Sequence, residues 1–136
     1  LPGMGVPWTE KSVLPGGDFH PNNFDFEVRE LLSRCPILNK ELATRLFRTY
    51  GSCAYDMTGK IKDTSDLGTS FGHDLYGFEV DYLIANEWVR SAEDVLWRRT
   101  KLGLFLSVAE SETLDGYIKK KVSVENHSQP ITDEEK

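Results

Sequence analysis

Residues 66–101 read DLGTSFGHDLYGFEVDYLIANEWVRSAEDVLWRRTK and contain the clearest periodicity of the chain. Apolar residues recur there at helical spacing in two successive runs, which predicts two amphipathic helices. We expect the first helix to begin near His73. We expect the second to begin at Ser91, where Asp94 at the third helical position completes a capping box. The stretch therefore indicates helices packed on helices rather than a sheet.

Three further runs with helical spacing flank this stretch. The first occupies residues 24–35 and is stopped by Pro36, and the second follows Asn39, a suitable cap, and ends at Gly51. The third begins at Ser107 with another capping box. These five helices, without a convincing strand, predict a small all-α fold. The residues expected on the buried faces are Phe24, Val28, Leu31, Leu32, Cys35, Leu42, Ala43, Leu46, Phe47, Tyr50, Leu75, Phe78, Tyr82, Leu83, Asn86, Leu114, Tyr117, Ile118 and Val122.

Composition divides the chain into three parts. Residues 1–22 hold four of the six prolines, a composition typical of a linker or loop. Residues 23–122 carry the helical patterns and predict one helical domain, large enough to bury a core without disulfides or metal ions. Residues 123–136 are polar and end in Asp-Glu-Glu-Lys, so we expect a disordered tail there.

Charge and hydropathy exclude several classes of protein. With 39% hydrophobic and 28% charged residues, the 136-residue chain has the composition of an ordinary soluble domain. Its net charge of −6 argues against a nucleic-acid binder, which needs a basic face. No apolar run approaches the ~20 residues that a membrane span requires. The start, Leu1-Pro2-Gly3, lacks a signal-peptide pattern, and we expect a fragment or a processed product.

The residue types that usually carry chemistry form no recognisable site. No GxGxxG follows a strand, and the histidines lack metal-ligand spacing. Cys35 and Cys53 are far apart and lack an activating neighbour, so we expect buried, reduced thiols and a cytoplasmic chain. We therefore predict no catalytic, cofactor-binding or metal-binding residue in this chain, and a structural or interface role for His73.

A cationic cluster at the end of the quoted stretch is the strongest candidate for function. Residues 86–101 carry four cations against three acids. This near balance favours ion pairs, so we expect at least one of Arg98 and Arg99 to pair with an acid of the same segment. Docking against another region and direct ligand contact are the alternatives, because guanidinium groups bind carboxylates and phosphates. The candidate interface or structural motif comprises His73, Glu87, Trp88, Arg90, Asp94, Trp97, Arg98, Arg99 and Lys101.

Two tryptophans and a lysine run each allow two interpretations. Trp88 and Trp97 are expected to pack in the core, and the alternative is an exposed contact with another domain or a membrane surface. The run Lys119-Lys120-Lys121 is expected to form a solvated helix face, and the alternative is contact with anionic lipid.

Several short pieces of the chain resemble one family. Those within the quoted stretch are Asp66-Leu67-Gly68, Phe71-Gly72-His73, Glu87-Trp88-Val89-Arg90, Ala92-Glu93-Asp94 and Leu96-Trp97-Arg98-Arg99-Thr100-Lys101. Weaker matches upstream are Leu14-Pro15-Gly16-Gly17-Asp18 and Arg48-Thr49-Tyr50-Gly51. Over residues 13–118 the chain resembles the C-terminal domain of FAD-dependent (aerobic) glycerol-3-phosphate dehydrogenases and of alpha-glycerophosphate oxidases.

The resemblance implies a parent enzyme that oxidises sn-glycerol 3-phosphate to dihydroxyacetone phosphate with FAD and passes the electrons to quinone or oxygen. It implies that this helical part is a non-catalytic cap that binds no FAD itself and packs on the parent's own N-terminal FAD and substrate region. The parent is expected to be cytoplasmic, with membrane-surface association at the inner face. The alternative function is a stand-alone helical protein-interaction module. Binding of nucleic acid through the cationic cluster is disfavoured by the charge balance.

Overall fold

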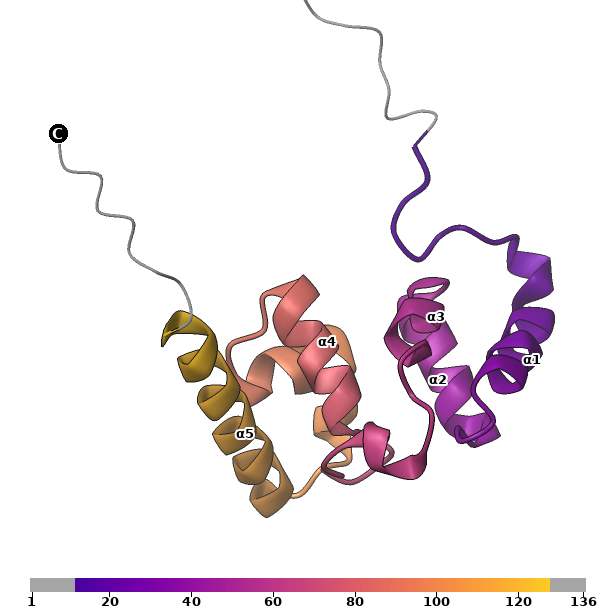
Figure 1. Ribbon diagram of the computed structural model, residues 1–136. Helices are drawn as coiled ribbons and strands as arrows, with labels where there is room; N and C mark the ends of the chain where they lie inside the picture. The colour runs from indigo at the N-terminus through magenta and orange to yellow at the C-terminus, as the bar shows by residue number, and fades with distance from the viewer. Residues whose placement is uncertain (1–11, 128–136) are drawn as a thin grey trace, which may run out of the picture. The chain divides into compact units, whose positions relative to one another are not determined.

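The computed structural model describes residues 12–127, in which helices joined by turns and loops are found and no strand (Figure 1). The all-α prediction is thus confirmed. The contacts divide the chain between Lys60 and Ile61 into two compact units, called unit 1 and unit 2 below, where the sequence predicted one domain over residues 23–122. The elements are η2 (Pro21–Asn23), α1 (Phe24–Arg34), α2 (Lys40–Tyr50) and α3 (Cys53–Thr58) in unit 1, and η3 (Thr64–Leu67), α4 (Gly77–Glu87), η4 (Asp94–Arg99), η5 (Leu102–Leu104) and α5 (Val108–His127) in unit 2.

Unit 1 is built on a helical hairpin of α1 and α2, with α3 packed on α2. Asn39 caps α2 as predicted, since its side chain accepts a hydrogen bond from the Leu42 N–H at 2.7 Å. The buried apolar side chains of this unit are Val28, Leu31, Cys35, Leu38, Leu42, Ala43, Leu46, Phe47, Ala54 and Met57. Cys53 is only half-buried, in contrast to the prediction, and both thiols are free.

Phe47 lies at the centre of an aromatic cluster in unit 1. Its ring centroid is 4.8 Å from that of Phe19, 5.7 Å from Phe24 and 5.8 Å from Tyr55, in edge-to-face arrangements. The Tyr55 hydroxyl donates to the Glu27 carboxylate at 2.6 Å. Burial, together with this carboxylate, raises the pKa of the Tyr55 phenol. The cluster joins the entry segment, α1, α2 and α3 into one core.

The segment before α1 is packed against the end of α2, although its composition predicted a linker. Residues 14–17 form a turn, with the Gly17 N–H donating to the Leu14 carbonyl at 2.9 Å, and the Ser52 N–H donates to the Gly16 carbonyl at 3.1 Å. A Cβ on Gly51 would stand 1.8 Å from the Gly16 carbonyl oxygen, so the two backbones touch. The two short upstream matches, 14–18 and 48–51, therefore meet in space.

The third predicted helix begins at Gly77, not near His73. His73 and Asp74 have positive φ angles of 49° and 60°, and the Leu75 N–H donates to the Gly72 carbonyl at 3.0 Å across them. Positive φ at both central residues characterises the tight turns of hairpins, and an isolated bridge pairs Ser70 with Tyr76 beside it. The local turn therefore overrides the helical pattern that the apolar spacing suggested.

The last helix matches its prediction at its start and runs longer than predicted at its end. The Glu110 carboxylate accepts from the Ser107 N–H at 2.8 Å and the Ser107 hydroxyl at 2.9 Å, which is the expected capping box. α5 continues to His127, so residues 123–127 belong to it and not to the tail. The rest of the predicted tail, residues 128–136, lies outside the described part of the chain, as do residues 1–11 of the predicted linker.

Unit 2 is held together by contacts between α4 and α5. Asp81 on α4 accepts a hydrogen bond from the Tyr117 hydroxyl at 2.9 Å and pairs with Lys121 at 3.1 Å. Asn86 is exposed instead of buried, because α4 ends one residue later and its amide donates back to the Tyr82 carbonyl at 3.0 Å. The buried apolar side chains are Ile61, Leu67, Phe71, Leu75, Val80, Leu83, Ile84, Val89, Ala92, Val95, Leu96, Leu102, Leu114 and Ile118.

The lysine run of α5 forms a solvated face, as predicted. Lys119, Lys120 and Lys121 are all exposed. Lys119 pairs with Asp115 at 2.6 Å, and Lys121 pairs with Asp81. Such exposed pairs contribute at most about 1 kcal/mol each.

Candidate functional site

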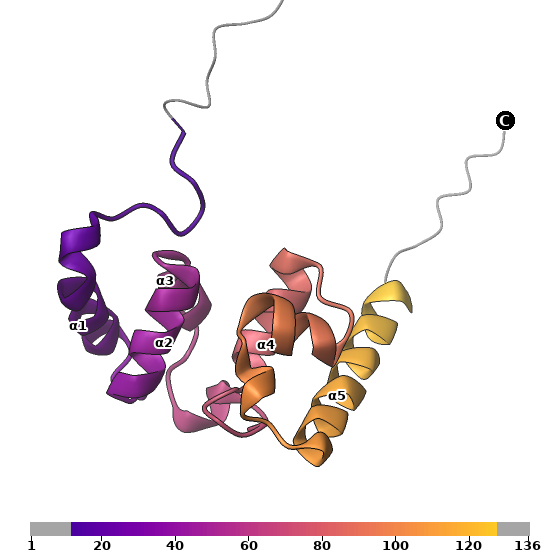
Figure 2. The same cartoon turned by 180° about the vertical axis from the view of Figure 1, so that it is seen from behind.

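The candidate motif lies in unit 2, on the segment that leaves α4 and forms η4. Figure 2 shows η4, in orange, beside α4. The predicted fourth helix is a short α-turn that widens into a π-helix, in which the Val95 carbonyl accepts from the Thr100 N–H at 2.9 Å and from the Thr100 hydroxyl at 2.8 Å. It ends at Arg99, and Lys101 then takes a left-handed conformation with φ of 62°.

Trp88 is 82% exposed, and its predicted place in the core is wrong. The residue ends α4 in the left-handed conformation, with φ of 59°, and its N–H reaches the Leu83 carbonyl. Val89 after it is buried, with 1% exposure, and fills the core position. A left-handed cap followed by a buried apolar residue is a common way to end a helix. Here it turns the Trp88 indole outward.

Asp94 organises the start of η4. Its carboxylate accepts from the Arg90 N–H at 3.1 Å, the Ser91 N–H at 3.2 Å and the Ser91 hydroxyl at 3.1 Å, and it pairs with Arg98 at 2.9 Å. The hydrogen bond from the Arg90 N–H is the largest cause that holds the pKa of Asp94 below its ordinary value, and Ser91 and Arg98 add to it. The capping box predicted for Ser91 and Asp94 is thus confirmed.

Asp94→Ala is expected to destabilise unit 2 by about 1–2 kcal/mol at pH 7, because it removes the acceptor for two backbone N–H groups. Since the folded-state pKa is depressed, the contribution of Asp94 is complete above the unfolded pKa of about 3.9 and is lost as the pH falls through the folded pKa. Urea unfolding of variant and wild type should differ at pH 7, and the difference should shrink at acid pH, as the pH falls through the folded-state pKa of Asp94. The exposed neighbour Glu93, changed to Ala, is the control. An equal difference at both pH values would contradict the role of the charge.

The cations of the cluster are engaged within unit 2. Arg99 pairs with the Glu87 carboxylate at 3.0 Å and donates to the Glu87 carbonyl at 3.3 Å, which ties η4 to the end of α4. The Lys101 ammonium donates to the Trp97 carbonyl at 2.8 Å, and the Arg90 guanidinium donates to the Val89 carbonyl at 3.2 Å. The predicted pairing of Arg98 or Arg99 with an acid is confirmed for both. The cluster therefore fixes the backbone around two tryptophans.

Trp97 is partly buried in unit 2. Its side chain is 47% exposed, and its ring lies over Gly103, where a Cβ would come within 2.4 Å of a ring carbon. Gly103 thus leaves room for one face of the indole. Trp97 and Val108 also line a hollow of about 240 Å³ between η4 and the start of α5. The prediction of core packing is therefore only half correct for Trp97.

Three exposed apolar residues follow the cluster and were not singled out from the sequence. Leu104 is 72% exposed, Phe105 62% and Val108 77%. We group these three residues with Trp97 under the name aromatic surface; they lie on η4, on η5 and the residue after it, and at the start of α5. The run LGLFL at residues 102–106 is the signal that could have revealed it, because it is too short and too apolar for a solvated connection.

His73 lies beside the aromatic surface. Its imidazole is exposed, and its ring centroid is 5.8 Å from that of Phe105. Its neighbour Gly72 has φ of 95°, and a Cβ there would stand 2.5 Å from a Glu110 carboxylate oxygen. The turn therefore lies in close contact with the capping residue Glu110 of α5. His73 thus borders the exposed surface and occupies a turn, as an interface or structural residue would.

Between residues 12 and 127, no three His, Cys, Asp or Glu side chains are grouped so that they could hold a metal ion. In this same range, no helix combines the length and the apolar composition needed to cross a membrane.

Comparison with known proteins places the chain in one family. The family described as the C-terminal domain of alpha-glycerophosphate oxidase matches residues 7–120. The chain is 42% identical over 116 residues to the aerobic glycerol-3-phosphate dehydrogenase of Escherichia coli, and 42% identical over 115 residues to the glycerol-3-phosphate dehydrogenase of Pseudomonas aeruginosa. It is 37% identical over 110 residues to the D-erythritol 1-phosphate dehydrogenase of Brucella abortus.

These matches cover most of this chain but a small part of each relative. The match covers 85% of this chain and 23% of the Escherichia coli enzyme. For the Pseudomonas aeruginosa enzyme the shares are 85% and 22%, and for the Brucella abortus enzyme they are 81% and 22%. The resemblance read from the short pieces thus extends over nearly the whole helical region. The chain belongs to the family of the C-terminal domain of alpha-glycerophosphate oxidase.

Proposed function

We propose that this chain is the C-terminal helical domain of an FAD-dependent enzyme that oxidises sn-glycerol 3-phosphate to dihydroxyacetone phosphate and passes the electrons to quinone. The family match over residues 7–120, with 42% identity to two glycerol-3-phosphate dehydrogenases, carries this proposal. The relative named for D-erythritol 1-phosphate, at 37% identity, supports polyol phosphates as the wider substrate class. The parent would act in the cytoplasm, at the inner face of the membrane where quinone is reached.

The enzyme's own substrate is tested by turnover. The full-length protein, supplied with FAD, is assayed with glycerol 3-phosphate and, separately, with D-erythritol 1-phosphate, using a quinone analogue as acceptor. We expect glycerol 3-phosphate to give the higher kcat/KM. A preference for D-erythritol 1-phosphate would move the protein to the second activity, and turnover of neither would overturn the proposed reaction.

The domain itself would be non-catalytic. The dinucleotide of FAD is usually held by a strand, a glycine-rich turn and a helix N-terminus, and residues 12–127 contain no strand. FAD would therefore be bound by the region upstream, where it supplies the hydride chemistry. The helical domain would contribute by covering and supporting that region.

The isolated chain is accordingly expected to bind no FAD and to leave glycerol 3-phosphate unchanged. Gel filtration of a mixture of chain and FAD, followed by flavin absorbance, measures the first, and dye reduction measures the second. Co-elution of one flavin per chain, or dye reduction above a buffer control, would refute the non-catalytic role.

The aromatic surface would be the face that packs on the catalytic region. Trp88 and the four residues of this surface expose large apolar side chains, and apolar side chains exposed together usually mark an interaction site. The ion pairs of Arg98 and Arg99 fix the backbone that carries these apolar side chains. The entropic cost of ordering this segment on binding is therefore small.

A charge placed on this face tests the docking. In the full-length enzyme, Phe105→Glu is expected to release the domain and to increase tryptic cleavage upstream of residue 12 severalfold. Phe26→Glu, at a 57% exposed phenylalanine of α1, is the matched control and should leave cleavage unchanged. Equal cleavage in the two variants would mean that the domain packs through another face. It would not alter the proposed reaction.

A further inference from the structure

A second surface, in unit 1, has the form of a receptor groove. It lies between α1 and α2 and has a volume of about 510 Å³. Each helix contributes residues at a spacing of four, so each wall is one continuous stripe. The wall from α1 carries an apolar stripe, Phe24, Val28 and Leu32, next to the charged residues Asp25 and Arg29. The wall from α2 carries the polar stripe Lys40, Thr44 and Arg48.

The two cations of this groove have no partner in the part of the chain that the structure describes. No ion pair or side-chain hydrogen bond engages Lys40 or Arg48 within residues 12–127, and both are exposed. Arg29 and Asp25 also line the groove, and Arg29 donates to the Asp25 carbonyl at 3.2 Å. Three cations against one acid leave the groove positive. In unit 2, by contrast, Arg98 and Arg99 of the cationic cluster are already paired with acids.

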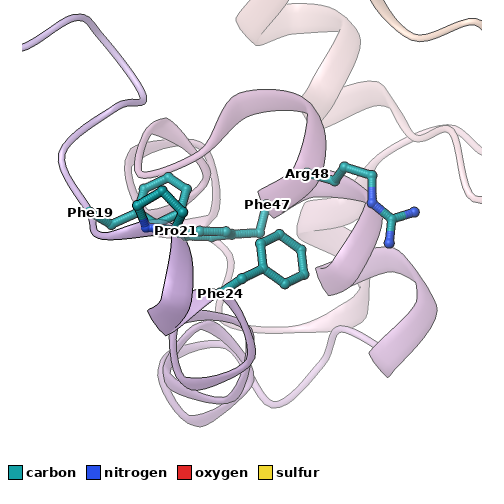
Figure 3. Close-up of a pocket in the computed structure, with 5 residues that line it drawn as sticks. All are labelled: Phe19, Pro21, Phe24, Phe47 and Arg48. Atoms are coloured by element: carbon teal, nitrogen blue, oxygen red, sulfur yellow. The ribbon is translucent and has the colours of Figure 1, made fainter.

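The apolar floor of the groove continues beyond its end. A neighbouring hollow of about 460 Å³ shares Phe24 and Arg48 with it and adds Phe19, Pro21 and Phe47. Figure 3 shows the guanidinium of Arg48 directed away from the aromatic rings, so that the charge lies at the rim of the apolar surface. The combined surface thus has an aromatic floor with cations along one edge.

We infer that this groove receives an acidic amphipathic α-helix of the parent's catalytic region. A helix lying in a groove presents residues at the same four-residue spacing, with apolar anchors on one side. Carboxylates on its other side would meet Lys40 and Arg48. The inference rests on the proposed function for the presence of such a region. The segment that leads into α1 lines the end of the groove through Phe19 and Pro21, and this tether keeps whatever precedes it at high local concentration.

Zero-length cross-linking tests the occupant directly. A carbodiimide joins a lysine amine to a carboxylate in contact with it. In the full-length enzyme, Lys40 is expected to be joined to an Asp or Glu of the catalytic region, identified by mass spectrometry of the digest. Lys40→Arg keeps the charge, removes the amine and should abolish this product alone. Lys120, equally exposed on α5, is the comparison and should give no such product.

Charge reversal then tests the chemistry of recognition. Arg48→Glu in the full-length enzyme is expected to lower the yield of the Lys40 product at least tenfold, whereas Lys120→Glu should leave it unchanged. Cross-linking of Lys40 only to carboxylates of its own unit, such as Asp25, would overturn the inference. Protection of the Lys40 amine from acylation by anionic lipid vesicles, without protection by the catalytic region, would also overturn the inference.

The two proposals fail separately. If the full-length enzyme turns over glycerol 3-phosphate but gives no Lys40 product with the catalytic region, the groove assignment is wrong and the reaction stands. If the product forms in an enzyme that does not oxidise glycerol 3-phosphate, the reaction is wrong and the groove assignment stands.

Discussion

Phe47→Ala is expected to lower the free energy of unfolding by about 3–5 kcal/mol, the range for removal of a fully buried phenylalanine ring. Phe47 is 1% exposed and touches aromatic rings from the entry segment, α1 and α3. Its removal leaves a cavity that the other rings cannot all fill, because Tyr55 is also tied by its hydroxyl to Glu27. The loss should therefore include the cavity as well as the transfer of the ring to water.

Urea unfolding followed by far-UV circular dichroism measures this effect. Phe26→Ala is the matched control, since Phe26 is the same residue type in the same unit but is 57% exposed on α1. It should change the stability by less than about 0.5 kcal/mol. Similar losses for the two variants would show that Phe47 does not centre the core.

Gly51→Ala is expected to cost at least about 3 kcal/mol, because it combines an unfavourable backbone conformation with a clash of backbone on backbone. Gly51 has φ of 56° and ψ of −136°. The new Cβ would stand 1.8 Å from the Gly16 carbonyl oxygen, which is itself bonded to the Ser52 N–H. The turn at residues 14–17 would have to leave the end of α2, and the aromatic cluster would lose the support of Phe19.

Gly116→Ala is the control for this second prediction. Gly116 lies within α5, and a Cβ there would meet no atom within 4 Å. Its replacement should stabilise the protein by about 0.5–1 kcal/mol through helix propensity. The urea midpoint should therefore fall in Gly51→Ala and rise in Gly116→Ala. A loss at Gly116 or a gain at Gly51 would contradict the contacts described for them.

The two surfaces proposed as docking sites differ in their chemistry. The aromatic surface of unit 2 is apolar, and the arginines beside it are already paired. The α1–α2 groove of unit 1 offers an apolar stripe beside Lys40 and Arg48, neither of which has a partner within residues 12–127. Apolar burial supplies affinity, and complementary charge supplies orientation and specificity. A domain that uses both would be held in one orientation on a larger partner.

The sequence by itself determined the helical class, three of the helix caps and the family. Asn39, Ser91 and Ser107 cap as predicted because a cap is a bond between residues two or three positions apart, which the local sequence specifies. The all-α class followed from spacing for the same reason. The matched family pieces were also local strings, so no tertiary information was needed to find them.

Only the tertiary structure decided what those residues do. Trp88 was predicted to be buried from its size, but Val89 fills the core and a left-handed cap turns the indole outward. His73 has positive φ, so its apolar neighbours could not extend the helix. The groove at Lys40 and Arg48 exists because α1 lies against α2. Exposure, ion pairing and grooves depend on residues distant in sequence, and local periodicity does not record which distant side chains become neighbours.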